Sequence, residues 1–135
     1  MLHLKSLYIM GPEASGKTTV GLGLALSLQK KGFKVGYIKP ISSSFHPTKQ
    51  EDEDALVFKQ ALNLLYDISV ITPLKIGSHY LSSLQKKEKY QRTIMASLDE
   101  IKKYDFDLVL IGGSTSLYHL SSHGLDDISL AEELQ

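Results

Sequence analysis

The stretch Tyr8–Pro40, YIMGPEASGKTTVGLGLALSLQKKGFKVGYIKP, decides the fold of this 135-residue chain. It begins with apolar residues, passes through a turn of small residues and continues as an aliphatic segment. Within it, Gly11–Thr18 matches the pattern G-x-x-x-x-G-K-[ST] at every fixed position. The match lies between an expected strand and an expected helix, which is the context in which this pattern forms a phosphate-binding loop.

This loop is expected to bind phosphate in three ways. Its backbone N–H groups turn inward and form a nest for phosphate oxygens, and the following helix adds the positive end of its dipole. Lys17 supplies a charge for the β- and γ-phosphates, and the Thr18 hydroxyl can bind Mg²⁺. A side chain at Gly16 would occupy the space of the phosphate. We therefore predict that the nucleotide is bound by Gly11, Pro12, Glu13, Ala14, Ser15, Gly16, Lys17, Thr18 and Thr19.

Strands and helices are expected to alternate along the chain. The expected strands are Leu4–Met10, Lys34–Lys39, a short one at Ile68–Thr72, and Asp107–Ile111; the expected helices are Lys17–Lys31, Glu51 to about Leu65, a long one anchored by Tyr90, Ile94, Leu98 and Ile101, and Ile128 onward. Ile41–Gln50 and Ser114–Asp127 are expected to be loops. Aliphatic residues cover most of the circumference of Lys17–Lys31, which predicts a helix buried against a sheet. The alternation predicts an α/β protein with a doubly wound, mainly parallel sheet, the P-loop NTPase fold.

Composition indicates an ordinary globular domain. Fifteen basic residues balance fifteen acidic ones, and 42% of the residues are apolar. We expect neither nucleic acid nor a membrane as a partner, and a cytoplasmic location. Because the chain has no cysteine, disulfides and thiolate metal sites are excluded. We expect one domain, 1–135, that lacks the C-terminal strands of the fold, since the sequence ends within an expected helix. Either the natural chain is longer, or this is a reduced version of the fold.

Three segments together resemble a known family. The phosphate loop, VGYIKPI (35–41) and EDEDALVFKQAL (51–62) resemble dethiobiotin synthetase and relatives such as the amidotransferase-type cobyrinic acid a,c-diamide synthases. The sequence is also similar to the dethiobiotin-synthetase-like amino-terminal domain of phosphotransacetylase-family proteins. That similarity continues through LNLLYDIS (62–69) and DLVLIGGSTSLYHLSSHGLDDISLAEEL (107–134), and so spans nearly the whole chain.

The resemblance implies roles for individual residues. Lys17 and Thr18 would bind the triphosphate and its metal. Lys39 corresponds to a lysine that faces substrate and phosphate, so that Lys17 and Lys39 form the candidate catalytic pair. Asp54 corresponds to an aspartate that helps to hold Mg²⁺. A solvated lysine at a strand end is the alternative for Lys39, and a simple acid at a helix start is the alternative for Asp54.

The resemblance fails after the third main strand. Dethiobiotin synthetase has a metal-binding glutamate there, whereas this chain has Gly112 in LIGGSTS. Asp105 and Asp107 are expected at the opposite end of the strand and cannot replace it. Pro12 stands where partition-type ATPases have a lysine that reaches across a dimer. A nucleotide-sandwiched dimer is therefore not indicated, although a homodimer remains open.

Other polar residues give weaker signals. His119 and His123 lie four residues apart, but surface histidines explain them better than a metal site does. Residues 114–116 could contact substrate or phosphate through their hydroxyl groups, and His46 is expected to be exposed in a loop.

Two functions follow, both with Mg²⁺ and with ATP or another purine nucleotide. The favoured one is a regulatory, nucleotide-sensing module, which the similarity to the amino-terminal domain of phosphotransacetylase-family proteins implies. The missing glutamate and the truncated end favour it. The alternative is an ATP-dependent ligase similar to dethiobiotin synthetase, in which ATP phosphorylates a carbamate made from a diamine and CO₂. Lys39 and Asp54 favour this alternative, which would require a small molecule as second substrate. A third possibility is a decayed phosphate loop, one that has lost its function and binds no nucleotide.

Overall fold

The computed structural model describes residues 4–42, 51–76, 87–114 and 120–134. The strands are β1 (Ser6–Ile9), β2 (Val35–Ile38), β3 (Ile41–Ser42), β4 (Leu74–Lys75) and β5 (Leu108–Gly112). The helices are α1 (Lys17–Lys30), α2 (Glu53–Ala61), α3 (Ile68–Ile71), α4 (Lys87–Lys102) and α5 (Asp127–Glu133), with a 3-10 turn at Ser121–His123. In these ranges, no helix combines the length and apolar character that crossing a membrane requires.

The main sheet consists of β1, β5 and β2, in that order, and all its strands are parallel. Ile9 of β1 pairs with Gly112 of β5, and Ile38 of β2 pairs with Ile111. Parallel strands end at the same edge of a sheet, so this register brings the carboxyl ends of the three strands together. The segments that follow β1, β2 and β5 therefore begin side by side.

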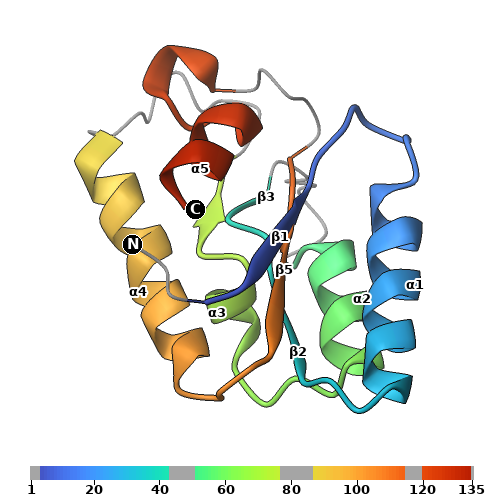
Figure 1. The fold of residues 1–135 in the computed structure, drawn as a ribbon. Coiled ribbons are helices and arrows are strands. Elements are labelled where there is room, and N and C mark those ends of the chain that lie inside the picture. The colour runs from blue at the N-terminus through green and yellow to red at the C-terminus, as the bar shows by residue number, and fades with distance from the viewer. Residues whose placement is uncertain (1–3, 43–50, 77–86, 115–119, 135) are drawn as a thin grey trace.

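Helices cover both faces of this sheet (Figure 1). α1 and α2 lie on one face, where they contact β5 and β2, and α4 and α5 lie on the opposite side. A parallel sheet with helices on both faces confirms the doubly wound α/β class predicted from the alternation of elements.

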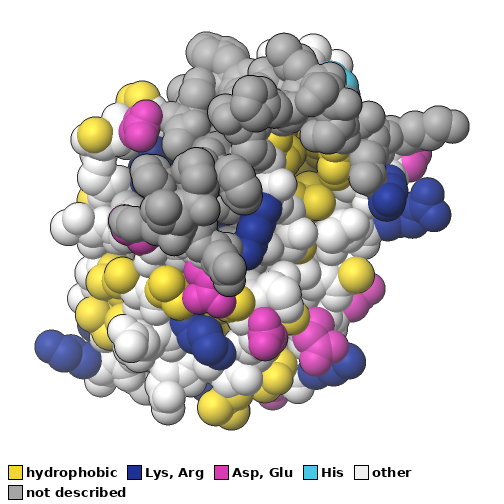
Figure 2. Space-filling model, turned by 180° about the vertical axis from the view of Figure 1, so that it is seen from behind, with side chains coloured by type: hydrophobic (Ala, Val, Ile, Leu, Met, Phe, Trp, Pro, Cys, Tyr) yellow, Lys and Arg dark blue, Asp and Glu magenta, His cyan; other side chains and the backbone are white. Residues whose placement is uncertain are grey.

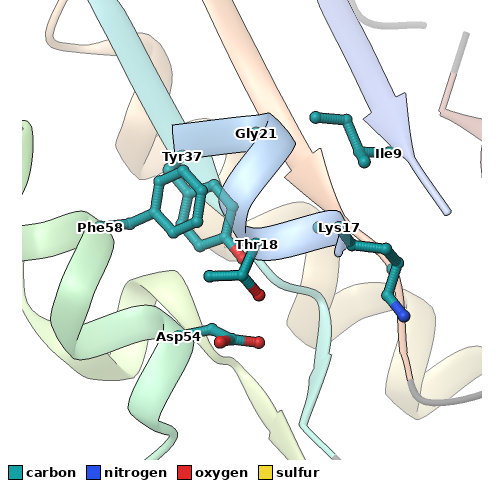
Figure 3. A pocket seen from close by; sticks show the side chains of 9 residues that line it. Ile9, Lys17, Thr18, Gly21, Tyr37, Asp54 and Phe58 are labelled. Atoms are coloured by element: carbon teal, nitrogen blue, oxygen red, sulfur yellow. The ribbon is translucent and has the colours of Figure 1, made fainter. Parts of the chain in front are cut away.

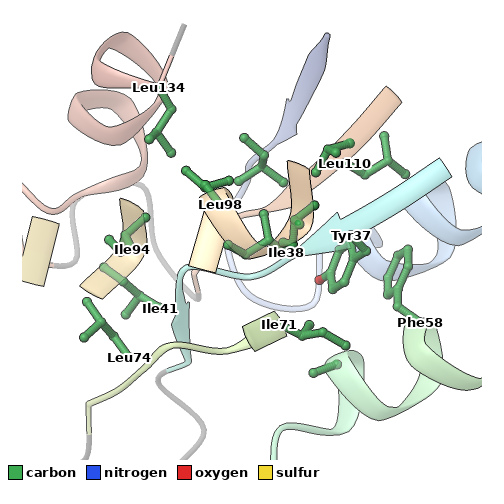
Figure 4. Packing of buried hydrophobic residues seen from close by; sticks show 14 of the residues in the cluster. Tyr37, Ile38, Ile41, Phe58, Ile71, Leu74, Ile94, Leu98, Leu110 and Leu134 are labelled. Carbon is green, nitrogen blue, oxygen red and sulfur yellow. The ribbon is translucent and has the colours of Figure 1, made fainter. Parts of the chain in front are cut away.

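The core is built around β2 and β5, as Figure 4 shows. All four residues of β2 are buried, as expected for a strand covered on both faces. In α4 the predicted apolar stripe is confirmed, because Ile94, Leu98 and Ile101 are buried. The largest hydrophobic side chains that are fully buried are Ile38, Phe58, Ile71, Ile94, Ile101, Leu110, Ile111, Leu125 and Leu130.

A second, two-stranded sheet extends the carboxyl end of β2. The Lys39 amide donates to the carbonyl of Ile71 at 2.8 Å, and β3 then pairs with β4 in parallel, with Ile41 opposite Leu74. Ile41 and Ser42 were expected to lie in a loop, and that prediction is wrong. The rest of the expected loop, including His46, lies outside the described residues.

The prediction of a strand at Ile68–Thr72 is also wrong, because Ile68–Ile71 form the short helix α3. Its β-branched residues favour a strand, but the Asp67 carboxylate accepts a hydrogen bond from the Ser69 amide at 2.9 Å and caps a helical turn. Ile71 is completely buried. Capping and packing therefore outweigh local propensity here.

Helix α1 is less buried than its composition suggested. Gly21 and Ala25 are its buried residues, whereas Val20 is 64% exposed and Leu26 is 36% exposed. The helix therefore packs with the small residues Gly21 and Ala25 buried, while Leu22, Leu24 and Leu28 are partly buried against the core. Over the face shown in Figure 2, acidic, basic and apolar side chains of the described residues are interspersed.

Mutation of Phe58 measures how much the packing of α2 against the core contributes to the stability of the fold. Phe58 is 2% exposed and Leu65 is 78% exposed. Phe58→Ala should lower the free energy of unfolding by about 3–5 kcal/mol, because it leaves a cavity. Leu65→Ala, the matched control, should change it by less than about 0.5 kcal/mol. Urea unfolding of both variants measures the difference, and equal effects would contradict the packing described.

Candidate nucleotide-binding site

The phosphate loop, Gly11–Thr18, connects β1 to α1 at the carboxyl edge of the sheet. Two of its residues have left-handed backbone conformations, Ala14 with φ of 57° and Gly16 with φ of 88°. An added Cβ atom at Gly16 would meet no atom of the described protein within 4 Å. Within the protein itself, glycine is therefore favoured at this position by the backbone conformation.

Gly16 is also the N-cap residue of α1 and has no side chain with which to cap it. The amide of Val20 makes the first hydrogen bond of the helix, to the Gly16 carbonyl at 3.0 Å. The amides of Lys17, Thr18 and Thr19 precede that bond and belong to the group of N–H donors that a helix start leaves without an intrahelical partner. This end of α1 therefore offers N–H groups and a positive partial charge to an anion.

The Lys17 side chain folds back over the loop. Its ammonium group donates to the carbonyl of Gly11 at 2.8 Å and to the carbonyl of Pro12 at 2.7 Å. These acceptors are neutral, and an ammonium group has three donors. Lys17 is thus held at the loop by carbonyl dipoles, and no carboxylate of the described residues accepts a hydrogen bond from it.

A pocket at the carboxyl edge brings together residues of β1, α1, β2, α2 and the end of β5 (Figure 3). It is lined by Ile9, Lys17, Thr18, Gly21, Tyr37, Asp54, Phe58, Gly112 and Gly113. In Figure 3 the Thr18 hydroxyl and the Asp54 carboxylate are directed toward one another, and the Lys17 side chain extends away from them. A hydroxyl and a carboxylate are hard oxygen donors of the kind that Mg²⁺ prefers, so these two residues fit a metal site.

The structure distinguishes Asp54 from the neighbouring acids. Asp52 is the N-cap residue of α2, and its carboxylate accepts from the Ala55 amide at 3.1 Å. Glu51 and Glu53 are exposed and do not line the pocket formed by described residues. Asp54 is therefore the acid of this run that reaches the phosphate loop.

Lys39 lies between two carboxylates. Its ammonium nitrogen is 3.0 Å from Asp52 Oδ2 and 3.0 Å from Asp54 Oδ2, and its side chain is almost completely buried. Burial lowers the pKa of Lys39, but the two carboxylates outweigh this effect and raise it above its usual value. In the same way, the Lys39 charge and the Ser42 hydroxyl overcome burial and hold the pKa of Asp52 below its usual value.

This environment differs from the role that the resemblance implied. Lys39 was expected to be directed toward substrate and phosphate, but among the described residues it forms a buried ion pair and is not one of those that line the pocket. The solvated strand-end alternative is wrong, since Lys39 is buried.

Gly112 occupies the position at which, by the resemblance, dethiobiotin synthetase has its glutamate. The surrounding packing explains why this chain has a glycine there. A Cβ atom at Gly112 would clash with the Tyr37 hydroxyl and would lie 3.0 Å from Cζ of the same ring. Tyr37 is itself fixed by stacking on Phe58, with the ring centroids 3.7 Å apart. The Tyr37 ring therefore occupies the space into which a side chain at position 112 would project.

Asp127 is a site residue to which sequence reasoning gave no role. It is buried at the start of α5, where its carboxylate accepts from the Tyr8 hydroxyl at 3.1 Å and from the Ser114 amide at 3.0 Å. It thereby joins the ends of β1 and β5 to α5. Two adjacent aspartates before a helix were the available signal, but the sequence does not tell which one is the cap; Asp126 is the residue that accepts from the Ser129 amide, at 3.0 Å.

The remaining candidates lie elsewhere. Asp107 accepts a hydrogen bond from the Lys34 amide at 2.7 Å, at the amino end of β5, which confirms that it is far from the loop along the strand. Thr115, Ser116 and His119 lie outside the described residues. Among the described residues, no cluster of three or more metal-binding side chains is present.

The fold and the loop define the class of protein. A parallel α/β sheet with a Gly-x-x-x-x-Gly-Lys-Thr loop between its first strand and first helix is that of a P-loop NTPase-like domain. The chain belongs to the AAA_26 family, whose model is described as an AAA domain and matches residues 5–135.

Two curated proteins are similar over part of their length. The chain is 44% identical to the protein RecA of Clostridium beijerinckii over 55 residues, which are 38% of this chain and 15% of RecA. It is 34% identical to the ATP-dependent dethiobiotin synthetase BioD of Methanocaldococcus jannaschii over 71 residues, 52% of this chain and 30% of BioD. The matches thus span less than a third of either relative. The resemblance to dethiobiotin synthetase is supported at low identity, while that to phosphotransacetylase-family proteins stays a prediction.

A solved structure supports the fold. FtsY from Mycoplasma mycoides has a TM-score of 0.52 over 98% of this chain and 38% of its own, at 15% identity. At this identity the likeness shows the fold alone.

The clash between a side chain at position 112 and the Tyr37 ring can be measured as a coupling energy between mutations at these two positions. Gly112→Ala should destabilise the protein by about 1–3 kcal/mol, because it overpacks a fixed ring. In a Tyr37→Phe background the cost should fall, since the atom closest to the new methyl group is gone. The matched control is Gly23→Ala, where a Cβ meets nothing within 4 Å and helix propensity should add about 1 kcal/mol. A cost of Gly112→Ala that does not change with Tyr37→Phe would contradict this assignment.

Asp127 should make stability depend on pH. Burial raises its pKa above the usual value, although the Ser114 amide and the Tyr8 hydroxyl oppose the shift. A carboxyl group with a raised pKa in the folded state stabilises the fold below its unfolded pKa, and this contribution is lost as the pH rises through the folded value. Asp127→Asn cannot ionise, so its stability relative to wild type should increase between acid and neutral pH.

Denaturant unfolding at a series of pH values measures this trend. Asp126→Asn is the matched control, because the pKa of Asp126 is lowered by hydrogen bonds from the Ser129 amide and hydroxyl, despite its burial. Its stability relative to wild type should decrease over the same pH range. Parallel trends in the two variants would show that Asp127 is not the group responsible.

Proposed function

We propose that this domain binds Mg²⁺ together with ATP, or another purine nucleotide, and serves as a nucleotide-sensing regulatory module. The observation that carries the proposal is the pocket in which Lys17 and Thr18 of the phosphate loop lie beside Asp54 of α2. The start of α1 offers amide donors, and Lys17 offers a charge whose hydrogen-bond acceptors, within the described part of the chain, are backbone carbonyl groups. An anionic phosphate group can therefore displace these contacts without leaving a buried carboxylate unpaired.

Thr18 and Asp54 are the residues that would hold the metal. When bound, Mg²⁺ would neutralise phosphate charge and fix the position of the phosphates. Among the described residues that line the pocket, Asp54 supplies the one carboxylate, and the Tyr37 ring blocks a side chain from Gly112. Binding needs no more than this, because Mg²⁺ is commonly held by one or two carboxylates together with phosphates and water. Transfer of a phosphoryl group is less well supported, and this difference favours sensing over catalysis.

The second candidate is an ATP-dependent ligase of the dethiobiotin synthetase type. The specific observation in its favour is that Lys39 follows β2 at the carboxyl edge, where ligands of open α/β sheets bind. The similarity to a dethiobiotin synthetase over 71 residues adds support. In this reaction Lys17 and Lys39 would stabilise charge on the transferred phosphoryl group. Lys39 would first have to leave Asp52 and Asp54, which makes this the weaker proposal.

Calorimetric titration with ATP, ADP and GTP, each with and without Mg²⁺, together with a phosphate-release assay, distinguishes the two functions. Binding that Mg²⁺ strengthens, without turnover, is expected. Phosphate release stimulated by a diamine and bicarbonate would support the ligase and contradict the regulatory proposal. Absence of binding by all three nucleotides would contradict both and support a decayed loop.

Lys17→Ala should weaken nucleotide binding at least roughly tenfold, because it removes a charge-assisted hydrogen bond to phosphate. Lys30→Ala is the matched control, since Lys30 lies in the last turn of the same helix and should leave the affinity unchanged. Thermal unfolding of both variants checks that they are folded. Equal affinities of the two variants would contradict a role for the phosphate loop.

A further inference from the structure

The carboxyl end of β2 holds a charge cluster of Lys39, Asp52 and Asp54, of which the proposed function uses Asp54 and leaves Lys39 without a role. Lys39 is 7% exposed and contacts Asp52 and Asp54. Asp54 also lines the pocket of the phosphate loop, next to Thr18. The same carboxylate therefore faces an ammonium group and the place proposed for a divalent cation.

The two carboxylates that hold Lys39 are not equivalent. The side chain of Asp52 is 1% exposed. It accepts from the Ser42 hydroxyl at 2.6 Å and from the Ala55 amide at 3.1 Å, in addition to Lys39. Both α2 and β3 thus fix Asp52 in place, and it is the permanent counter-ion of Lys39.

Asp54 is held far less firmly. Its side chain is 37% exposed, and its carboxylate contacts the Lys39 ammonium group at 3.0 Å. It lies in the first turn of α2, so its carboxylate can change direction without disturbing the cap that Asp52 provides. Losing Asp54 would still leave Lys39 paired with Asp52. Asp54 is therefore the exchangeable partner of the cluster.

We propose that Lys39 is a positioning residue that competes with the divalent cation for Asp54 and so sets the metal dependence of nucleotide binding. This inference rests on the proposed function. In the metal-free protein, Lys39 holds the Asp54 carboxylate. Metal binding takes Asp54 from Lys39, while Asp52 keeps the lysine neutralised and buried. The resemblance suggests a different role, direct contact of Lys39 with phosphate, and the two roles predict different results.

Lys39→Met removes the competitor. Nucleotide affinity without metal should change little, and the gain in affinity that Mg²⁺ produces should rise roughly three- to tenfold, the size of a coupling of about 1 kcal/mol. Calorimetric titration of ADP with and without Mg²⁺ measures this gain. Titration with Mn²⁺ in the presence of ADP, followed by electron paramagnetic resonance of free Mn²⁺, reads metal binding directly. Lys59→Met is the matched control, because Lys59 lies on α2 but donates to the carbonyls of Leu64 and Tyr66.

A second variant guards against a folding defect in Lys39→Met. Asp52→Asn can still cap α2, but it removes the permanent counter-ion of Lys39. Lys39 should then hold Asp54 more firmly, and the gain from Mg²⁺ should fall severalfold even though Thr18 and Asp54 are intact. Opposite shifts in the two variants support the proposal.

The Asp54→Asn background separates competition from a general effect of charge. Competition for Asp54 cannot occur there, so adding Lys39→Met should no longer change the Mg²⁺ effect; a persisting change would overturn the proposal. A loss of nucleotide affinity in Lys39→Met that is equal with and without metal would also overturn it, in favour of direct phosphate contact. Failure of the proposed function would be recognised separately, because the wild-type domain itself would then bind no nucleotide.

Discussion

The site depends on the stacking of Tyr37 on Phe58. Their rings lie nearly parallel, with an interplanar angle of 4°, and join β2 to α2. Gly21 permits this contact from the side of α1, since a Cβ atom there would lie 3.2 Å from the Phe58 ring. Gly112 permits it from the side of β5, where a Cβ atom would clash with Tyr37. Two glycines on separate elements thus make room for one aromatic pair.

This packing has two consequences for the metal site. Asp54 lies one helical turn before Phe58 on the same helix, so fixing Phe58 against the sheet also directs Asp54 toward Thr18. The same rings fill the space beside Gly112. The interaction that positions the first carboxylate therefore excludes a second one from the end of β5. A single packing constraint thus accounts for the position of Asp54 and for the glycine at position 112, and it favours the proposed nucleotide binding over phosphoryl transfer.

The phosphate loop and most of the main helices and strands could be predicted from the sequence, because they depend on patterns of neighbouring residues. The phosphate loop follows from residue types at fixed spacing, and α1, α4 and β5 follow from periodicity and apolar runs. Features that depend on tertiary contacts could not be predicted. The cap at Asp67 converts a β-branched run into α3, and the choice among four adjacent acids depends on how α2 is rotated by Phe58. Asp127 becomes significant only because the chain brings it back to Tyr8 at the far end of the sequence.

The two lysines of the candidate catalytic pair are held by different kinds of acceptor, and this difference separates binding from catalysis. Carbonyl dipoles hold Lys17, so an incoming phosphate can take over its charge at little cost. Carboxylates hold Lys39, and removing one partner of a buried ion pair costs about 3–5 kcal/mol. A metal could take Asp54, but Asp52 would remain, buried and fixed by Ser42 and Ala55. Lys39 would then still be neutralised by Asp52, which is not among the described residues that line the pocket of the phosphate loop. Two lysines acting on one phosphoryl group, as the ligase proposal supposes, would therefore require Lys39 to leave a buried carboxylate, whereas nucleotide binding through Lys17 breaks no ion pair of the described residues.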